Sequence, residues 1–319
     1  MKVKENRLPP RKFKEKHPFL WDLKTNWVLW LMLVPIAAFF IINSYLPMVG
    51  IYFAFTDFNF IGGLFGSPFV GLKNFEFLFK SNVLWRLLRN TILYNVAFIL
   101  IGNAAQIFIA VLISQLTCKK FKKTTQTMIF MPYFVSMVVV GVVSYNLFNY
   151  ENGLLNGIIT GLGLERMDFY TKKWLWPVII LFFNIWKGLG YGVVVYLATI
   201  MGIDPGLHEA AMVDGATVFQ RIRYIVLPHL KPTFIILLIY ALGGIVRGNF
   251  DLVHQLVGGN GQLYAVTDIL DTYVYRAATE TFDFGMGTAA GVFQSVIGLV
   301  IVLVVNWLIK RKNAEYAMF

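Results

Sequence analysis

A group of polar and aromatic side chains interrupts one apolar run of this 319-residue chain. Such side chains are costly in a lipid bilayer unless they face water, a solute or a partner, so they are candidates for binding a polar solute. The positive charge of Lys187 also attracts a carboxylate, although this lysine could equally snorkel to the outer interface or pair with an acid of another subunit. The candidates in this run are Asn184, Trp186, Lys187, Tyr191 and Tyr196.

Weaker candidates for the same role follow in later segments, at Asn249, Asp251 and Gln294. The alternative for Asp251 is an ordinary capped loop that it forms with His254. No Gly-Lys pair occurs, so the chain lacks the phosphate-binding loop GxxxxGK[ST] and we expect it not to split ATP by that route.

Two other patterns that resemble chemical sites have simpler explanations. Gly188, Gly190 and Gly192 lie inside the same apolar run, where small residues favour close helix packing or bending over nucleotide binding. The same holds for Gly287 and Gly291. The histidines, at positions 17, 208, 229 and 254, lack the spacing of a metal site, and Cys118 is the only cysteine, so we predict no bound metal and no internal disulfide.

Composition places these residues in a membrane protein. Of all residues 57% are hydrophobic and only 14% are charged, whereas a soluble domain has about 25% charged residues. The net charge of +11 does not predict nucleic-acid binding, because the basic residues lie at the edges of apolar runs and form no single basic face. The lipid bilayer is therefore the predicted surrounding medium.

Apolar windows long enough for the roughly 20 residues of a membrane-spanning helix predict an all-α, polytopic fold with six transmembrane helices. A β-barrel is disfavoured because the runs are continuous and do not alternate. The fifth window is too short alone, so it must recruit Leu227–Leu230 or Gly248–Phe250, with Lys231 and Arg247 reaching outward at its ends. The six windows are Thr25–Thr56, Asn90–Cys118, Thr124–Tyr150, Trp174–Ile203, Pro232–Val246 and Phe284–Ile309.

The distribution of Lys and Arg predicts that both termini are cytoplasmic, because basic residues are retained on that side. Eighteen of the 28 lie in residues 1–26, 117–125, 202–232 and 310–319. Nine lie in the intervening segments 56–90, 149–173 and 247–283. This gives a basic cytoplasmic tail (1–26), a transmembrane domain (27–309) and a short cytoplasmic tail (310–319). Phe19, Leu20, Trp21 and Leu23 predict either a short interfacial helix or a disordered tail.

The segment between the fourth and fifth windows is predicted to be structured. Asp204 and Pro205 form a helix start, and Gly215 can take the left-handed conformation that ends a helix. Thr217 can cap a second short helix, and Pro228 suits the first turn of the next span. We therefore expect two short helices joined at a glycine bend.

The same segment, residues 204–228, carries a recognisable motif. Glu209-Ala210-Ala211 is followed by three residues, Gly215, nine residues, Ile225, one residue, then Leu227 and Pro228. This spacing resembles the EAA loop of binding-protein-dependent ABC importer permeases at every defining position. The chain length, the six spans and the late segment Asp271–Arg276 (DTYVYR) resemble the branch that imports oligosaccharides.

The resemblance implies a type I importer permease in the bacterial cytoplasmic membrane that moves a sugar, possibly acidic, by alternating access. It implies a second permease subunit, with a heterodimer preferred and a homodimer as the alternative. It also implies two ATP-binding subunits and an extracytoplasmic sugar-binding protein. The chain itself then binds no cofactor, and ATP and Mg²⁺ bind at the partner subunits. The motif residues implied to couple to the ATPase are Glu209, Ala210, Ala211, Asp214, Gly215, Ile225, Leu227 and Pro228.

Other classes of protein fit the sequence less well. A stand-alone secondary transporter or channel is the first alternative, but such proteins usually show duplicated halves or intramembrane acids. A membrane enzyme would need clustered titratable residues. The segment with Glu151, Glu165 and Asp168 is predicted to lie outside the cell, either as a contact for a substrate-binding protein or as a solvated connector.

Overall fold

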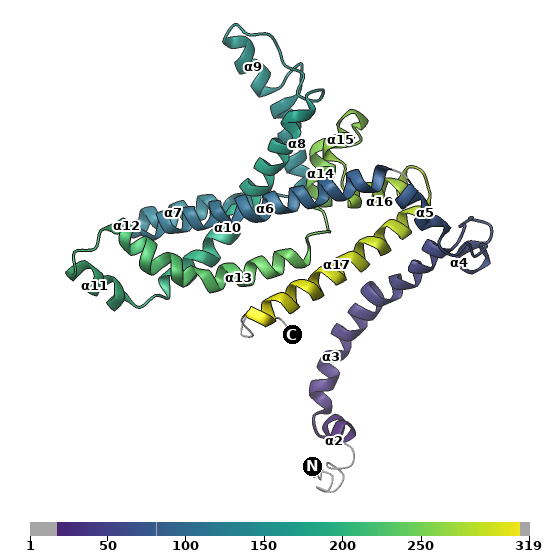
Figure 1. Ribbon diagram of the computed structural model, residues 1–319, viewed down its shortest axis with the longest axis horizontal. Helices are drawn as coiled ribbons and strands as arrows, with labels where there is room; N and C mark the ends of the chain where they lie inside the picture. Colours follow the sequence, from purple (N-terminus) through teal and green to yellow (C-terminus); the bar gives the residue numbers. More distant parts are fainter. Residues whose placement is uncertain (1–17, 81, 313–319) are drawn as a thin grey trace, which may run out of the picture.

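The computed structural model describes residues 18–80 and 82–312, and this part of the chain is almost entirely helical (Figure 1). No strand forms in it, and one isolated antiparallel bridge joins Thr56 and Phe69. The all-α polytopic fold predicted from the apolar windows is thus confirmed. The helices of the N-terminal half are α2 (Pro18–Thr25), α3 (Trp27–Phe40), η1 (Ile41–Tyr45), η2 (Leu46–Phe55), α4 (Gly63–Gly66), α5 (Lys73–Lys80), α6 (Asn82–Ser114), α7 (Lys119–Phe130), η3 (Met131–Phe134), α8 (Met137–Phe148) and α9 (Leu154–Gly161).

The C-terminal half continues the helical pattern and ends in a long helix. Its elements are η4 (Lys173–Leu175), α10 (Trp176–Met201), α11 (Pro205–Val213), α12 (Val218–Arg221), η5 (Ile222–Val226), α13 (Leu227–Gly243), α14 (Phe250–Val257), η6 (Gly261–Leu263), α15 (Tyr264–Thr267), α16 (Leu270–Thr279) and α17 (Phe284–Lys312).

The centre of the bundle is the pair α6 and α10, which run side by side along most of their length. Glycines allow this closeness: a Cβ at Gly192 would lie 2.0 Å from the side chain of Gln106 on α6, and one at Gly190 would lie 2.5 Å from the backbone of Ile129 on α7. The packing role predicted for the glycine run is confirmed at these two positions. At Gly188 a Cβ would meet no atom within 4 Å, so packing among the described residues does not account for that glycine.

The predicted spans correspond to five long apolar helical segments and one bent pair among the described residues. The third window, Thr124–Tyr150, corresponds to the bent pair, in which Lys119–Phe134 and Met137–Phe148 meet at an angle of 96°. Two residues account for the break. Pro132 has no N–H for a continuing helix, and the hydroxyl of Ser136 accepts a hydrogen bond from the N–H of Val139 and so begins α8.

The fifth span is longer than its apolar window and runs from Val218 to Gly243. It recruits Leu227–Leu230, as one alternative proposed, while Gly248–Phe250 instead leads into α14. The expected separate second helix after the glycine bend is therefore corrected: it starts at Thr217, as predicted, but continues into the span without a stop. Pro228 removes one backbone donor, and a π-helical turn over Ile222–Val226 absorbs the irregularity just before it.

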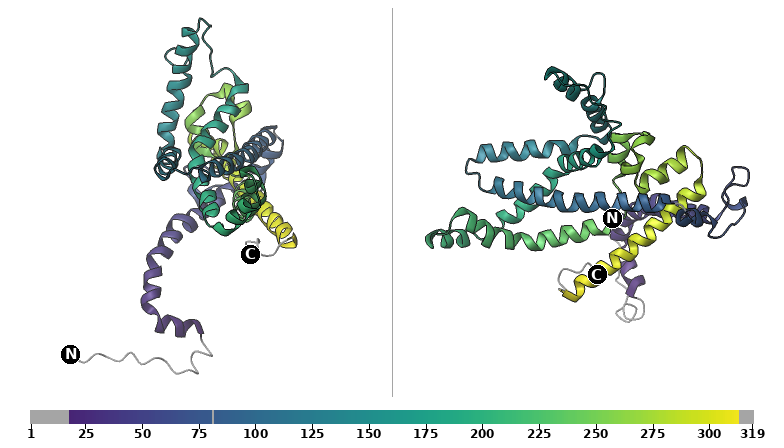
Figure 2. Two further views of the ribbon diagram at one scale, coloured as in Figure 1. Left: turned by 90° about the vertical axis from the view of Figure 1, so that its left-hand side faces the viewer. Right: turned by 45° about the horizontal axis from the view of Figure 1, so that its top comes forward.

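The first span forms an arm beside the bundle (Figures 1 and 2). No residue of α3 is buried, whereas the following η2 packs against α17. Before it, α2 is a helix, the first of the two alternatives for residues 19–23. The rest of the predicted basic tail, residues 1–17, and residues 313–319 of the C-terminal tail lie outside the described residues.

Candidate functional site

Two open grooves follow the face of the bundle formed by α6, α13 and α17. One has a volume of about 870 Å³ and the other about 820 Å³. Both are lined by Gly243, Arg247 and Val302, so they adjoin at the turn that follows α13. The larger groove extends to Asn184 on α10, and the smaller one follows α17 to Phe284.

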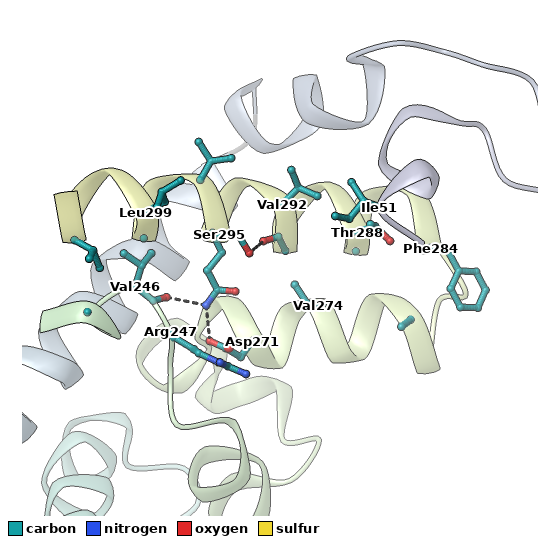
Figure 3. Close-up of a pocket in the computed structure, with 18 residues that line it drawn as sticks. Ile51, Val246, Arg247, Asp271, Val274, Phe284, Thr288, Val292, Ser295 and Leu299 are labelled. Atoms are coloured by element: carbon teal, nitrogen blue, oxygen red, sulfur yellow. Dashed lines mark hydrogen bonds between the residues drawn. The ribbon is translucent and has the colours of Figure 1, made fainter. Parts of the chain in front are cut away.

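The smaller groove contains a carboxylate, an amide and a guanidinium close together (Figure 3). The Gln294 side chain on α17 donates to the carbonyl of Val246 (2.8 Å) and to Asp271 Oδ2 on α16 (3.1 Å). The backbone N–H of Gly248 donates to the same Asp271 oxygen at 2.6 Å. Burial raises the pKa of Asp271, and these hydrogen bonds and the charge of Arg247 oppose that rise only in part.

The larger groove has a wall of asparagines and one exposed aromatic ring. Asn95 on α6 donates to the carbonyls of Ile245 (2.9 Å) and Arg247 (3.1 Å). Tyr240 on α13 is 77% exposed, and it lines this groove together with Asn184. The groove therefore combines amide groups with an aromatic face, a composition suited to a polar, ring-containing ligand.

Arg247 lies where the two grooves meet. The carbonyls of Ile245, Val246 and Arg247 accept hydrogen bonds from Asn95 on one side and Gln294 on the other. These bonds satisfy the backbone after α13 ends and fix the turn in place. The Arg247 side chain is exposed and makes no hydrogen bond or ion pair within residues 18–80 and 82–312.

Arg247 and Tyr240 were missed as binding candidates in the sequence. Arg247 follows an apolar window and was interpreted as a flanking residue that reaches outward. Tyr240 lies within that window with no polar neighbour to mark it. The signal that was present is the sequence Val246-Arg247-Gly248-Asn249, in which a charge meets a helix-ending turn.

The predicted path residues of α10 do not share one surface. Lys187 donates to the backbone carbonyls of Tyr133 (3.0 Å) and Val135 at the break between α7 and α8. Tyr191 is exposed and stacks on Tyr133, with ring centroids 5.7 Å apart. Trp186 packs against the apolar cluster around Phe183.

Tyr196 is a correction, because it is completely buried in the chain. Its hydroxyl donates to Asn103 Oδ1 at 2.7 Å, inside the core that joins α6, α10 and α13. Residue type alone does not distinguish a tyrosine in the core from one that lines a groove. Of the α10 candidates, Asn184 is the one that lines the larger groove.

The weaker path candidates also divide into residues that line a groove and residues that do not. Gln294 and Asn249 line the grooves, and the Asn249 side chain also caps α14 by accepting from the N–H of Leu252 (3.2 Å). The capped loop expected around Asp251 and His254 is thus a capped helix, in which Asp251 is exposed and His254 stacks on Phe250.

The DTYVYR segment forms most of α16 and ties it to the bundle. Arg276 donates to both carboxylate oxygens of the buried Asp268, at 3.1 and 2.8 Å. Burial lowers the pKa of Arg276, but the hydrogen bond and charge of Asp268 raise it by more, so the net shift is upward. At the other end of the segment, Asp271 holds the turn beside Arg247.

The EAA segment lies at one end of the bundle, beside the turn between α6 and α7 (Figure 1 and Figure 2, right). Asp204 accepts from the N–H of Gly206 (2.9 Å) and begins α11, and Gly215 ends it with a φ of +76°. Thr217 and Gln220 then form a reciprocal capping box. The exposed members of the motif are Glu209, Ala210, Asp214, Gly215, Leu227 and Pro228, while Ala211 and Ile225 are half-buried.

A helical bundle with several apolar spans, an open groove lined in part by polar side chains and a projecting helix at one end defines a multi-pass membrane permease. Residues 106–314 match the family described as the binding-protein-dependent transport system inner membrane component, and the chain belongs to this family.

Individual sequence relatives support this family assignment. The chain is 36% identical to the polygalacturonan/rhamnogalacturonan transport system permease protein YteP of Bacillus subtilis (strain 168), over 90% of this chain and 89% of the relative. It is 33% identical to the protein LplB of the same organism, over 92% of both chains.

A solved structure shares the fold. A chain of a bacterial ABC transporter involved in the import of the acidic polysaccharide alginate aligns with a TM-score of 0.83 and 34% identity, covering 92% of this chain and 99% of that one. A chain of the bacterial alginate transporter in complex with an alginate pentasaccharide-bound periplasmic protein aligns with a TM-score of 0.82. The predicted family of ABC importer permeases is thus confirmed.

Proposed function

We propose that this chain is one permease subunit of an ATP-driven importer for oligosaccharides that carry carboxylates, in the bacterial cytoplasmic membrane. The observation that carries the proposal is the EAA segment, a capped short helix that projects from the bundle and leads through Gly215 into a 26-residue helical span. A projecting, capped helix is a rigid element on which a second protein can dock.

Coupling follows from this arrangement. The exposed Glu209 and the small Ala210 offer a carboxylate and a close-packing surface to an ATP-binding subunit. Closure of two such subunits around ATP and Mg²⁺ then moves the permease between inward-facing and outward-facing states. The chain itself catalyses no reaction. The excess of Lys and Arg in the 117–125 and 202–232 segments supports a cytoplasmic position for this end.

The substrate class is supported by the groove and by the relatives. Tyr240 and Asn184 provide an aromatic face and an amide, and Arg247 provides a positive charge. Two relatives have names or titles that specify acidic polysaccharides, polygalacturonan and alginate. The grooves are open along the bundle, so a second permease subunit, in a heterodimer, completes the path. An extracytoplasmic sugar-binding protein supplies the ligand.

Reconstitution tests the proposal. Proteoliposomes should hold this chain with its second permease and ATP-binding subunits, with the binding protein outside and ATP inside. We expect uptake of a galacturonate trisaccharide that requires ATP and every subunit. Uphill uptake by this chain alone, driven by an ion gradient, would establish the alternative of a secondary transporter.

A further inference from the structure

Three basic side chains on the helices α6, α10 and α16 have partners within the chain. Lys187 is bound by the carbonyls of Tyr133 and Val135. Arg276 forms an ion pair with Asp268 at 2.8 Å, and Arg86 approaches the same carboxylate at 3.8 Å. These cations are held by the fold and are poorly placed to bind a solute.

Arg247 differs from them in three respects. Its guanidinium is exposed, it lines both grooves, and it has no hydrogen-bond or ion-pair partner within residues 18–80 and 82–312. The nearest acid by electrostatic effect is Asp271, whose Oδ2 already accepts from the N–H of Gly248 and the amide of Gln294. The five donors of Arg247 are thus left for a ligand.

The backbone under Arg247 is fixed before any ligand arrives. Asn95 from α6 and Gln294 from α17 hold the carbonyls of the turn, and Asp271 holds the next N–H at 2.6 Å. A turn held from three helices keeps the base of the arginine in one position, which lowers the entropy that binding must offset.

The neighbouring groups fit a sugar acid better than a simple anion. Tyr240, exposed in the larger groove, offers a ring on which the C–H face of a pyranose packs. Asn184 lines the same groove and makes no hydrogen bond within the described ranges, so its amide is left for hydroxyls. A bare phosphate or sulfate would use neither group.

We propose that Arg247 is the specificity-determining residue of this subunit, binding the carboxylate of a uronic-acid unit in a two-point hydrogen-bonded pair as the oligosaccharide passes through the groove. Tyr240 and Asn184 bind the ring and hydroxyls of the same or an adjacent unit. This inference rests on the proposed sugar import. It replaces Lys187, the lysine singled out in the sequence, as the source of selectivity for acids.

The test uses the full transporter in proteoliposomes with two sugars of equal length, a galacturonate trisaccharide and its methyl ester. Arg247→Gln removes the charge, and Arg247→Lys keeps it without the planar fork. Arg166→Gln is the control, because Arg166 is an exposed arginine in the 149–173 segment, outside both grooves. Basal ATP hydrolysis is measured for each variant to establish that the complex assembles.

We expect Arg247→Gln to raise the KM for the acid about tenfold or more, the value of losing a charge-assisted hydrogen bond. The KM for the ester should rise by a smaller factor than the KM for the acid, and every value for Arg166→Gln should stay near the wild-type value. Arg247→Lys should raise the KM for the acid by a smaller factor, and it decides the matter if the Gln variant does not assemble.

Three results overturn the inference while sugar import stands. They are wild-type affinity for the acid in both Arg247 variants, an equal loss of acid and ester uptake, and a wild-type transporter that imports only the neutral sugar. A wild-type transporter that imports neither sugar overturns both the inference and the proposed function.

Discussion

The ammonium of Lys187 on α10 lies 3.0 Å from the carbonyl oxygen of Tyr133, at the point where α7 ends. A second hydrogen bond reaches the carbonyl of Val135. The chain bends by 96° there, and a bend leaves carbonyls without helical donors. The lysine supplies those donors, so its first role is to hold the bend.

Lys187→Met should therefore destabilise the protein by about 1–3 kcal/mol, because two backbone carbonyls at the bend lose hydrogen bonds from a charged donor. Thermal unfolding in detergent measures this. Lys172→Met, at an exposed position in the preceding loop, removes the same charge and should change the midpoint little. Equal midpoints for the two variants would show that the bend does not need the lysine.

Gly215→Val should uncouple transport from ATP hydrolysis. Gly215 has a φ of +76°, which costs a residue with a side chain about 1–2 kcal/mol. No atom lies within 4 Å of the position that a Cβ would occupy, so the effect comes from the backbone alone. Uptake and ATP hydrolysis are measured together in proteoliposomes. Gly215→Asn is the matched control, because asparagine tolerates this conformation better. Normal import by the valine variant would refute the coupling role of the bend.

Tyr196→Phe should lower stability without changing sugar selectivity. The hydroxyl is buried and donates to Asn103 Oδ1 at 2.7 Å, so its removal leaves a buried acceptor unpaired at a cost of about 1–3 kcal/mol. Tyr45→Phe, at an exposed tyrosine, is the control. A change in the ratio of acid to ester uptake for Tyr196→Phe would show that Tyr196 does contact the transported sugar.

Asp268→Asn, in the turn between α15 and α16, should strongly destabilise the protein. The carboxylate is almost fully buried and is paired with Arg276, and breaking such a pair from one side costs about 3–5 kcal/mol. Detergent unfolding curves give the value, with the exposed Glu151→Gln as the reference. A loss no larger than that of Glu151→Gln would mean that Arg276 is solvated in the folded protein.

Asp271 should make stability depend on pH in a definite direction. Burial raises the pKa of the Asp271 carboxyl above its ordinary value of 3.8 in the folded protein. The stability that this carboxyl contributes is therefore fully present below pH 3.8, and it is lost as the pH rises through the higher pKa of the folded state. Unfolding midpoints of wild type and Asp271→Asn, measured from acid to neutral pH, should show the wild type losing stability relative to the variant as the pH rises.

The pH dependence of stability should have the opposite sign for Glu76. The hydrogen bond and ion pair with Lys80 lower the pKa of Glu76. The small stability that this carboxylate contributes is therefore present above its ordinary pKa of 4.5 and is lost as the pH falls. Glu76→Gln should therefore follow the reverse trend. Parallel trends for the two variants would contradict the assignment for Asp271.

The sequence predicted the long elements well because each depends on local information. Apolar windows with at most one charged residue located α6, α10 and α17. The caps at Asp204 and Thr217 and the turn at Gly215 appear where their side-chain chemistry requires. The bend at Ser136 also has a local signal, Pro132 followed by a capping serine, but a hydropathy window averages over both.

The groove was harder to predict because it depends on which helices meet. Tyr191 and Tyr196 are five positions apart on α10, and one is 54% exposed while the other is fully buried. In an apolar helix with no polar face, nothing local separates them. Arg247 gains its position only through Asn95 and Gln294, which lie about 150 and 50 residues away in the chain.

The span Val218–Gly243 joins the capping box at Thr217 to the turn that carries Arg247. Its 26 residues form a rod about 39 Å long, at 1.5 Å of rise per residue. In the proposed importer, a displacement of the EAA segment by an ATP-binding subunit is therefore transmitted along this rod to the turn that carries Arg247. On that proposal, one conformational change driven by ATP hydrolysis both reorients the permease and weakens the binding of a sugar carboxylate at Arg247.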